Sequence, residues 1–145
     1  MPVDAKDAIA ALDKLITDLE AATKDGVDDG AHQLQGLIRE NAPHLSGELA
    51  ASVAVTGPYP VVSGYAAKVG PTLIYGRIRE LGGRIPGERT VMTHPFLRWW
   101  QDGKPVFARS VRQKGSRYVL RSVEEFRPQL RNVLMRHWAD AMRMV

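Results

Sequence analysis

The chain has 145 residues, of which 44% are apolar and 25% are charged. This length fits a single domain over residues 1–145, and the composition is that of a globular protein rather than a disordered one. No stretch approaches the roughly 20 apolar residues of a membrane span, and the first residues lack the pattern of a signal peptide. We therefore expect a soluble protein, cytosolic when made, with no membrane partner. The absence of cysteine excludes disulfides and thiolate metal sites.

Charge is divided unevenly along the chain. Residues 1–50 carry 4 Lys and Arg against 10 Asp and Glu, a net charge of −6, and residues 51–145 carry 16 against 6, a net charge of +10. Two interpretations are open, because opposite fields attract within a molecule as well as between molecules. The acidic segment lies against the basic part of its own chain, or copies meet acidic end to basic end, as in a ring. The acidic contact candidates are Asp13, Asp18 and Glu20.

Residues 1–42 form an acidic segment whose apolar residues recur at helical spacing. They make two stripes, the first of Ile9, Leu12, Ile16 and Leu19 and the second of Val27, Ala31, Leu34 and Ile38. The eight-residue step between the stripes turns the apolar face by about 80°. Because Gly26 lies at this step, the pattern predicts a kinked long helix or two helices that meet there. Pro43 ends the helical run.

Residues 49–111 predict a small antiparallel sheet with a short helix at 73–82. The stretches LAASVAVTG and VVSGYAAKVG have the period-two pattern of strands, interrupted by Gly57-Pro58 and by Gly70-Pro71. In the short helix, Ile74, Ile78 and Leu81 have helical spacing, and Gly82-Gly83 provides a C-terminal stop.

A hairpin is predicted over residues 96–111, FLRWWQDGKPVFARSV, with Asp102-Gly103 in a tight primed turn. A two-residue loop pairs Gln101 with Lys104 and Trp99 with Val106. Alternation then separates the two adjacent tryptophans. The face with Trp99 also carries Leu97, Val106 and Ala108 and is a predicted core face. The opposite face carries Phe96, Arg98, Trp100, Phe107 and Arg109, and its aromatic and arginine side chains are typical of a subunit interface.

The chain closes with a predicted amphipathic helix over residues 122–144. Its apolar positions are Phe126, Leu130, Val133, Leu134, Trp138, Ala141 and Met142. Ser122 and Glu125 have capping-box spacing, but Pro128 is too deep for a first turn that begins after Ser122. The helix therefore bends at Pro128 or starts there. Together these elements predict an α+β fold.

Motifs for chemistry are absent from the sequence. The four histidines are scattered, there is no phosphate-cradling loop, and Glu80 and Glu88 are separated by a segment that fixes no geometry. We predict no catalytic residue, no cofactor and no metal site, with an enzyme of unrecognised site as a weaker alternative.

A basic run is the stronger candidate for function. It would bind nucleic acid through phosphates without reading sequence, or its residues are ordinary solvated charges. Its members are Arg109, Arg112, Lys114, Arg117 and Arg121.

The order of these elements resembles the neck or tail-completion proteins of long-tailed bacteriophages, over about residues 35–140. The segments that carry the resemblance are APHLSGELAASV, YAAKVGPT, YGRIRELGG, FLRWWQDGKPVFARSV and QKGSRY. The family's short motifs match Pro43, Gly47-Glu48-Leu49, Tyr75, Glu80-Leu81-Gly82, Gly103-Lys104, Phe107, Ala108-Arg109 and Val111. At QKGSRYVL the sequence departs from the pattern, in which a proline and a phenylalanine precede the last helix, and Tyr118 stands near that aromatic position.

The resemblance implies a non-enzymatic virion component, also described as a head-to-tail connector, minor capsid or virion morphogenesis protein. Such a protein forms a ring at the head-to-tail joint, is made in the host cytoplasm, and contacts a stopper or adaptor ring and the tail terminator or tube. Double-stranded DNA passes through the ring. The arginines would then pair with the acidic helix of a neighbour or line the lumen. A small basic nucleic-acid-binding protein is the alternative.

Overall fold

The computed structural model describes residues 4–44, 47–86 and 97–143, and it confirms the predicted α+β class. Where the sequence predicts one domain over 1–145, the contacts of the chain cluster in two compact units. Unit 1 comprises Met1–Thr72 with Tyr118–Val145, and unit 2 comprises Leu73–Arg117.

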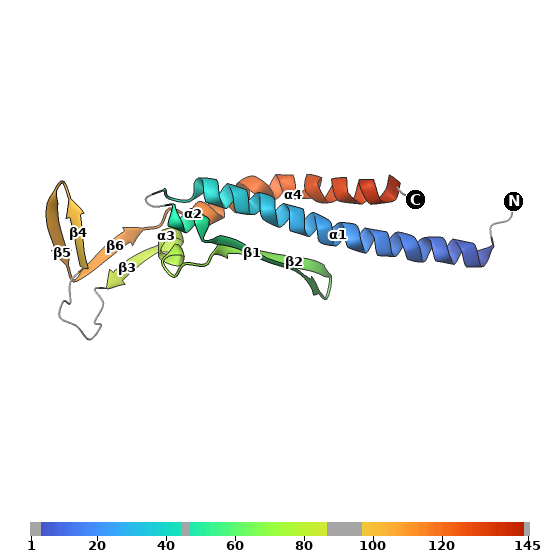
Figure 1. Ribbon diagram of the computed structural model, residues 1–145, viewed down its shortest axis with the longest axis horizontal. Coiled ribbons are helices and arrows are strands. Elements are labelled where there is room, and N and C mark those ends of the chain that lie inside the picture. The colour runs from blue at the N-terminus through green and yellow to red at the C-terminus, as the bar shows by residue number, and fades with distance from the viewer. Residues whose placement is uncertain (1–3, 45–46, 87–96, 144–145) are drawn as a thin grey trace. The chain divides into compact units, whose positions relative to one another are not determined.

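Unit 1 is a pair of long helices with a β-hairpin packed along one of them (Figure 1). Helix α1 (Ala5–Asn41) and helix α4 (Tyr118–Arg143) run antiparallel, since the end of α1 contacts the start of α4. The short helix α2 (Glu48–Ala51) leads into the hairpin of β1 (Val53–Val61) and β2 (Gly64–Pro71). The buried core lies where these elements meet, and its members are Ile38, Ala42, Leu49, Val53 and Tyr118.

Helix α1 is continuous through Gly26, so the two-helix alternative is wrong. The change of stripe has another cause: Gly26 and Gly30 are buried against α4. A Cβ atom at Gly26 would lie 2.9 Å from Leu134 Cδ2, and one at Gly30 would lie 3.0 Å from Leu130 Cδ1. The two glycines let the helix axes approach closely, and the second stripe faces the interior of unit 1.

Enlarging Gly30 is expected to destabilise the helix pair. Gly30→Leu should lower the free energy of unfolding by about 1–3 kcal/mol, as overpacking does in a close-packed interface. Gly36 is the matched control in the same helix, because a Cβ atom there meets nothing within 4 Å. Gly36→Ala should raise stability by about 0.5–1 kcal/mol through helix propensity alone. Urea unfolding measures both changes, and equal effects at the two positions would contradict the close packing.

Helix α4 begins earlier than predicted and is not divided by its proline. It starts at Tyr118, so Ser122 lies inside the helix, where its hydroxyl donates to the Tyr118 carbonyl at 2.7 Å. The predicted capping box is therefore wrong, and so is a start at Pro128. The helix continues without interruption through exposed Pro128, since buried residues on both sides of the proline, Ser122, Phe126 and Val133, stabilise both parts of the helix.

The predicted interruption at Gly57-Pro58 is also wrong. Strand β1 runs through these residues and accommodates them with a shift of register between Thr56 and Tyr59. This is the behaviour of a β-bulge, which inserts a residue without ending the strand. The segment before β1, predicted as strand from residue 49, begins with the single turn of helix α2.

Unit 2 contains α3 (Gly76–Leu81) and two antiparallel strand pairs. Strand β3 (Gly82–Pro86) pairs with β6 (Ser110–Lys114), and β4 (Leu97–Gln101) pairs with β5 (Lys104–Ala108). The described strands thus form three two-stranded sheets instead of the one predicted sheet. Helix α3 lies within the predicted 73–82 and stops at Gly82, whose φ of 76° favours glycine.

The β4–β5 hairpin matches its predicted register at each described pair, from Leu97 with Ala108 to Gln101 with Lys104. Asp102 and Gly103 occupy the turn with φ of 51° and 73°, as a primed two-residue turn requires. Phe96 lies outside the described residues.

Candidate functional site

The outer face of the β4–β5 hairpin is an exposed aromatic surface built around one arginine. Trp100 and Phe107 are 65% and 59% exposed. The Arg98 guanidinium lies 5.3 Å from the centroid of the Trp100 ring and 5.7 Å from that of the Phe107 ring. These are cation–π distances, so the arginine holds both rings in place while the rings stay open to solvent. We call Arg98, Trp100 and Phe107 the hairpin patch.

The inner face of the same hairpin is half-buried, which confirms the predicted alternation. Its members are Leu97, Trp99, Val106 and Ala108. Trp99 is not among the buried core residues, so its assignment to the core is wrong. In the described part of the chain β4 and β5 pair only with each other. A lone two-stranded hairpin is marginally stable in water, so burying the hairpin patch against another chain would stabilise it.

Two cations of the predicted basic run lie together on the β3–β6 ribbon, with one that the sequence analysis missed. Arg112 and Lys114 are exposed and alternate with half-buried Val111 and Gln113. Arg84 of β3 is paired directly opposite Arg112, and its Nε donates to Ser110 Oγ at 2.8 Å. Only strand pairing reveals Arg84, since it lies 28 positions from Arg112 in the sequence.

The rest of the basic run is placed elsewhere. Arg109 lies between β5 and β6, and Arg117, at a φ of 51°, ends unit 2. Arg121 belongs to α4 and hence to unit 1. The run is therefore not one patch: its members are distributed over two units.

The three acidic candidates, like the basic run, do not form one patch, because they lie on different sides of helix α1. Asp13 and Glu20 are exposed and lie within about 40° of Ile9 around the helix axis, whereas Asp18 lies about 180° from it. Asp18 lines a shallow pocket toward the end of α4, with Lys14, Asp25, His137 and Asp140. Only Asp13 and Glu20 thus flank the first apolar stripe.

That stripe is unpartnered in the described structure. Ile9, Leu12 and Ile16 are 59%, 58% and 56% exposed. Helix α1 extends past the C-terminal end of α4 (Figure 1). The shallow pocket near that end of α4 is lined on α1 by Lys14 and later residues, which follow Ile9 and Leu12 in the chain. Soluble proteins expose single apolar side chains commonly, but three at one helix face mark a contact surface. We call Ile9, Leu12 and Ile16 the stripe.

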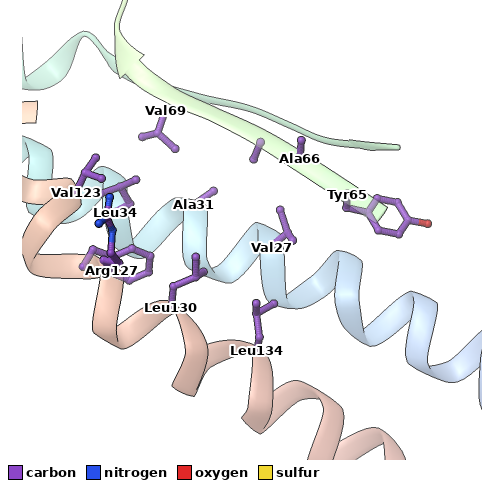
Figure 2. A pocket seen from close by; sticks show the side chains of 13 residues that line it. Val27, Ala31, Leu34, Tyr65, Ala66, Val69, Val123, Arg127, Leu130 and Leu134 are labelled. Atoms are coloured by element: carbon purple, nitrogen blue, oxygen red, sulfur yellow. The ribbon is translucent and has the colours of Figure 1, made fainter. Parts of the chain in front are cut away.

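An apolar groove of about 470 Å³ opens along the middle of α1. Figure 2 shows Val27, Ala31 and Leu34 of α1 between the side chains of β2 on one side and those of α4 on the other. The full lining is Val27, Gly30, Ala31, Leu34, Tyr65, Ala66, Ala67, Val69, Val123, Phe126, Arg127, Leu130 and Leu134. Of the described residues that line the groove, Arg127 is the one with a charged side chain. No local pattern in the sequence predicts this groove, because its walls come from segments far apart in the chain.

Polar contacts fasten α1 to α4 on either side of the glycines. Trp138 Nε1 donates to Thr23 Oγ1 at 2.9 Å, and Asn41 Nδ2 donates to Ser122 Oγ at 3.0 Å. His137 Nε2 lies 3.0 Å from Asp29 Oδ2. The hydrogen bonds from His137 and Gln33 hold the pKa of Asp29 below its ordinary value of 3.8. These contacts fix the lengthwise alignment of the helix pair, and with it the groove.

The lowered pKa of Asp29 predicts a pH-dependent contribution to stability. A depressed folded-state pKa means that the contribution is complete above about pH 4 and is lost as the pH falls through the folded value. Because the side chain is 39% exposed, we expect Asp29→Asn to cost less than about 1 kcal/mol at neutral pH. Urea unfolding of both proteins should show this difference at neutral pH and a smaller one in acid. An unchanged difference in acid would contradict the assignment.

The residues that match the family motifs serve the backbone and core in this structure. Leu49 is in the buried core, Gly47 has a φ of 75°, and Tyr75 caps α3. The Glu80 carbonyl accepts from the Arg117 amide at 3.0 Å. Pro43 follows α1, Gly82 ends α3, and Gly103 completes the hairpin turn.

Within residues 4–44, 47–86 and 97–143 no group of His, Cys, Asp or Glu has the arrangement of a metal site. No helix in these ranges is long and apolar enough to cross a membrane. Compared with known proteins, the chain matches no family model, no curated protein and no solved structure.

Proposed function

We propose that the protein is a structural component of the head-to-tail joint of a long-tailed bacteriophage. It assembles there as a homo-oligomeric ring through which double-stranded DNA passes, and it takes no part in catalysis. The resemblance of the sequence to neck and tail-completion proteins supports this proposal. The observation that carries the assembly role is the hairpin patch, where Trp100 and Phe107 stand exposed beside Arg98. Aromatic and arginine side chains are enriched at the buried centres of interfaces.

The charge distribution supports a ring in particular. A cyclic assembly uses a heterologous contact, in which one surface of a subunit meets a different surface of its neighbour. The acidic residues Asp13 and Glu20 on α1 and the cations Arg84, Arg112 and Lys114 on the β3–β6 ribbon are two such different surfaces. Their attraction would steer each subunit to the next. The stopper or adaptor on one side and the tail terminator or tube on the other are the further partners.

A small basic nucleic-acid-binding protein is the second candidate, favoured by the β3–β6 ribbon. Arg84, Arg112 and Lys114 put three exposed cations on this ribbon. Three phosphate contacts give a slope of about −3 in a plot of log affinity against log salt concentration. In a ring, the same residues would touch DNA loosely enough to let it slide.

The first test is the mass of the purified protein in solution, at low and moderate salt, with and without double-stranded DNA. We expect a closed oligomer, visible as rings by electron microscopy, that persists at moderate salt. A monomer or dimer that binds DNA tightly and releases it with the stated salt slope would promote the second candidate and reject the first.

The second test is genetic. A nonsense mutation in the gene of the parent phage should leave filled heads and separate tails in the infected host, because the joint between them is missing. Normal virions from such an infection would contradict the proposed place in the virion.

A further inference from the structure

We propose that the stripe of one copy, Ile9, Leu12 and Ile16, docks in the apolar groove of a second copy of the same chain. The inference rests on the proposed ring and names a contact between its subunits in addition to the hairpin patch. Neither surface is covered within the described residues: the stripe is more than half exposed, and the groove is open between β2 and α4.

The stripe can reach only the groove of another molecule. The stripe and the floor of the groove belong to the same uninterrupted helix, α1. Between Ile9 and Val27 the helix rises about 27 Å, at 1.5 Å per residue. A continuous helix cannot fold back on itself, so the stripe never reaches its own groove.

The shapes of the two surfaces match a known form of recognition. An amphipathic helix binds in a hydrophobic groove through anchors spaced i, i+3 and i+7, and the stripe has this spacing. The groove presents Leu34, Val69 and Leu130, among others, for such anchors. Burial of both surfaces removes apolar area from water, which favours association.

The charged residues beside the two surfaces also favour docking of the stripe in the groove. Asp13 and Glu20 flank the stripe, and Arg127 is the charged residue that lines the groove. No ion pair is recorded for any of the three in the part of the chain that the structure describes. Docking would place acidic side chains beside an arginine. A phosphate or other anionic ligand is a poor match for the groove, since the rest of its lining is apolar apart from backbone atoms and the Tyr65 hydroxyl.

The contact is head-to-tail, with a different surface used by each partner. Each subunit would give its stripe to one neighbour and receive a stripe from the other, which closes a ring or builds a filament. The groove and the stripe both lie within unit 1, so the contact does not depend on how the two units are arranged.

Cross-linking between single-cysteine variants tests the docking, because the protein has no cysteine of its own. Leu12→Cys in the stripe and Ala66→Cys in the groove are prepared separately, mixed, and treated with a short bismaleimide. We expect a cross-linked dimer in the mixture and none with either variant alone. Ala11→Cys is the matched control, since residue 11 is exposed, lies about 100° around the helix axis from Leu12 in the direction away from the stripe, and should react much less with Ala66→Cys.

The outcomes separate this inference from the proposed function. If the protein forms rings but Leu12→Cys and Ala66→Cys do not cross-link, the docking is wrong and the ring remains. If they cross-link but electron microscopy shows open filaments instead of rings, the docking holds and the closed ring is wrong. Equal reaction of Ala11→Cys would overturn the docking. The docking would also be wrong if a small apolar dye or a different phage protein protected Ala66→Cys from reaction with the maleimide and a second copy of this chain did not.

Discussion

Trp100→Ala is expected to abolish assembly of the protein while leaving its helices folded. The side chain is 65% exposed in the subunit, so its removal leaves no cavity in a core. At the centre of an interface a tryptophan is worth about 2 kcal/mol or more, which weakens each contact roughly 30-fold. In a ring this loss is repeated at every junction. Analytical ultracentrifugation should therefore detect the variant as a monomer at concentrations at which the parent protein is oligomeric.

Ile74→Ala provides the control for the first prediction. Ile74 is 95% exposed and belongs to the same unit, but it is not part of the hairpin patch. Assembly should survive this change. If Trp100→Ala instead unfolds the isolated subunit, measured by circular dichroism and urea unfolding, Trp100 supports the fold and the interface assignment is wrong. Oligomers unaffected by either change would also reject the hairpin patch as a contact.

Ile38→Ala is expected to lower the free energy of unfolding by about 2–5 kcal/mol, the usual range for emptying such a position in a core. Ile38 is fully buried and contacts the small cluster that joins α1 to α2, β1 and α4. A domain of this size has a total stability of roughly 5–15 kcal/mol, so the variant would be substantially unfolded at modest denaturant concentration.

Ile9→Ala is the matched control, with the same substitution in the same helix. Ile9 is 59% exposed, and we expect a change in stability within about 0.5 kcal/mol. Its effect should be on assembly, since it shortens the stripe. Comparable losses of stability at the two positions would show that α1 is packed differently from the arrangement described here.

The sequence predicted the β4–β5 hairpin well because its determinants are local. A two-residue turn at Asp102-Gly103 fixes the register, and the register fixes which face each side chain occupies. Alternation alone places Trp99 and Trp100 on opposite faces of the hairpin, although it does not predict that Trp99 is only half-buried. For the same reason all three residues of the hairpin patch could be named from the sequence.

The errors have tertiary causes. Whether α1 breaks at Gly26 is decided by Leu134, more than a hundred residues later, whose side chain needs the space that a glycine leaves. The start of α4 is set by the burial of Tyr118, which the capping pattern at Ser122 does not report. The groove, too, has walls from β2 and α4 that no local pattern brings together. Each of these features depends on pairing between distant segments, which propensity and spacing do not encode.

Unit 1 is built from two separate stretches of the chain, so it cannot be complete until the second stretch has been synthesised. Its first part, with α1 and the β1–β2 hairpin, leaves the ribosome before residues 73–117 of unit 2, and α4 follows only afterwards. Until α4 has been synthesised, Ile38 and the face of α1 with Gly26 and Gly30 are not covered by α4, and the groove lacks one of its walls. A nascent or truncated chain would therefore be unable to accept a neighbour's helix. Only finished subunits would polymerise, and incomplete ones would be left to proteolysis.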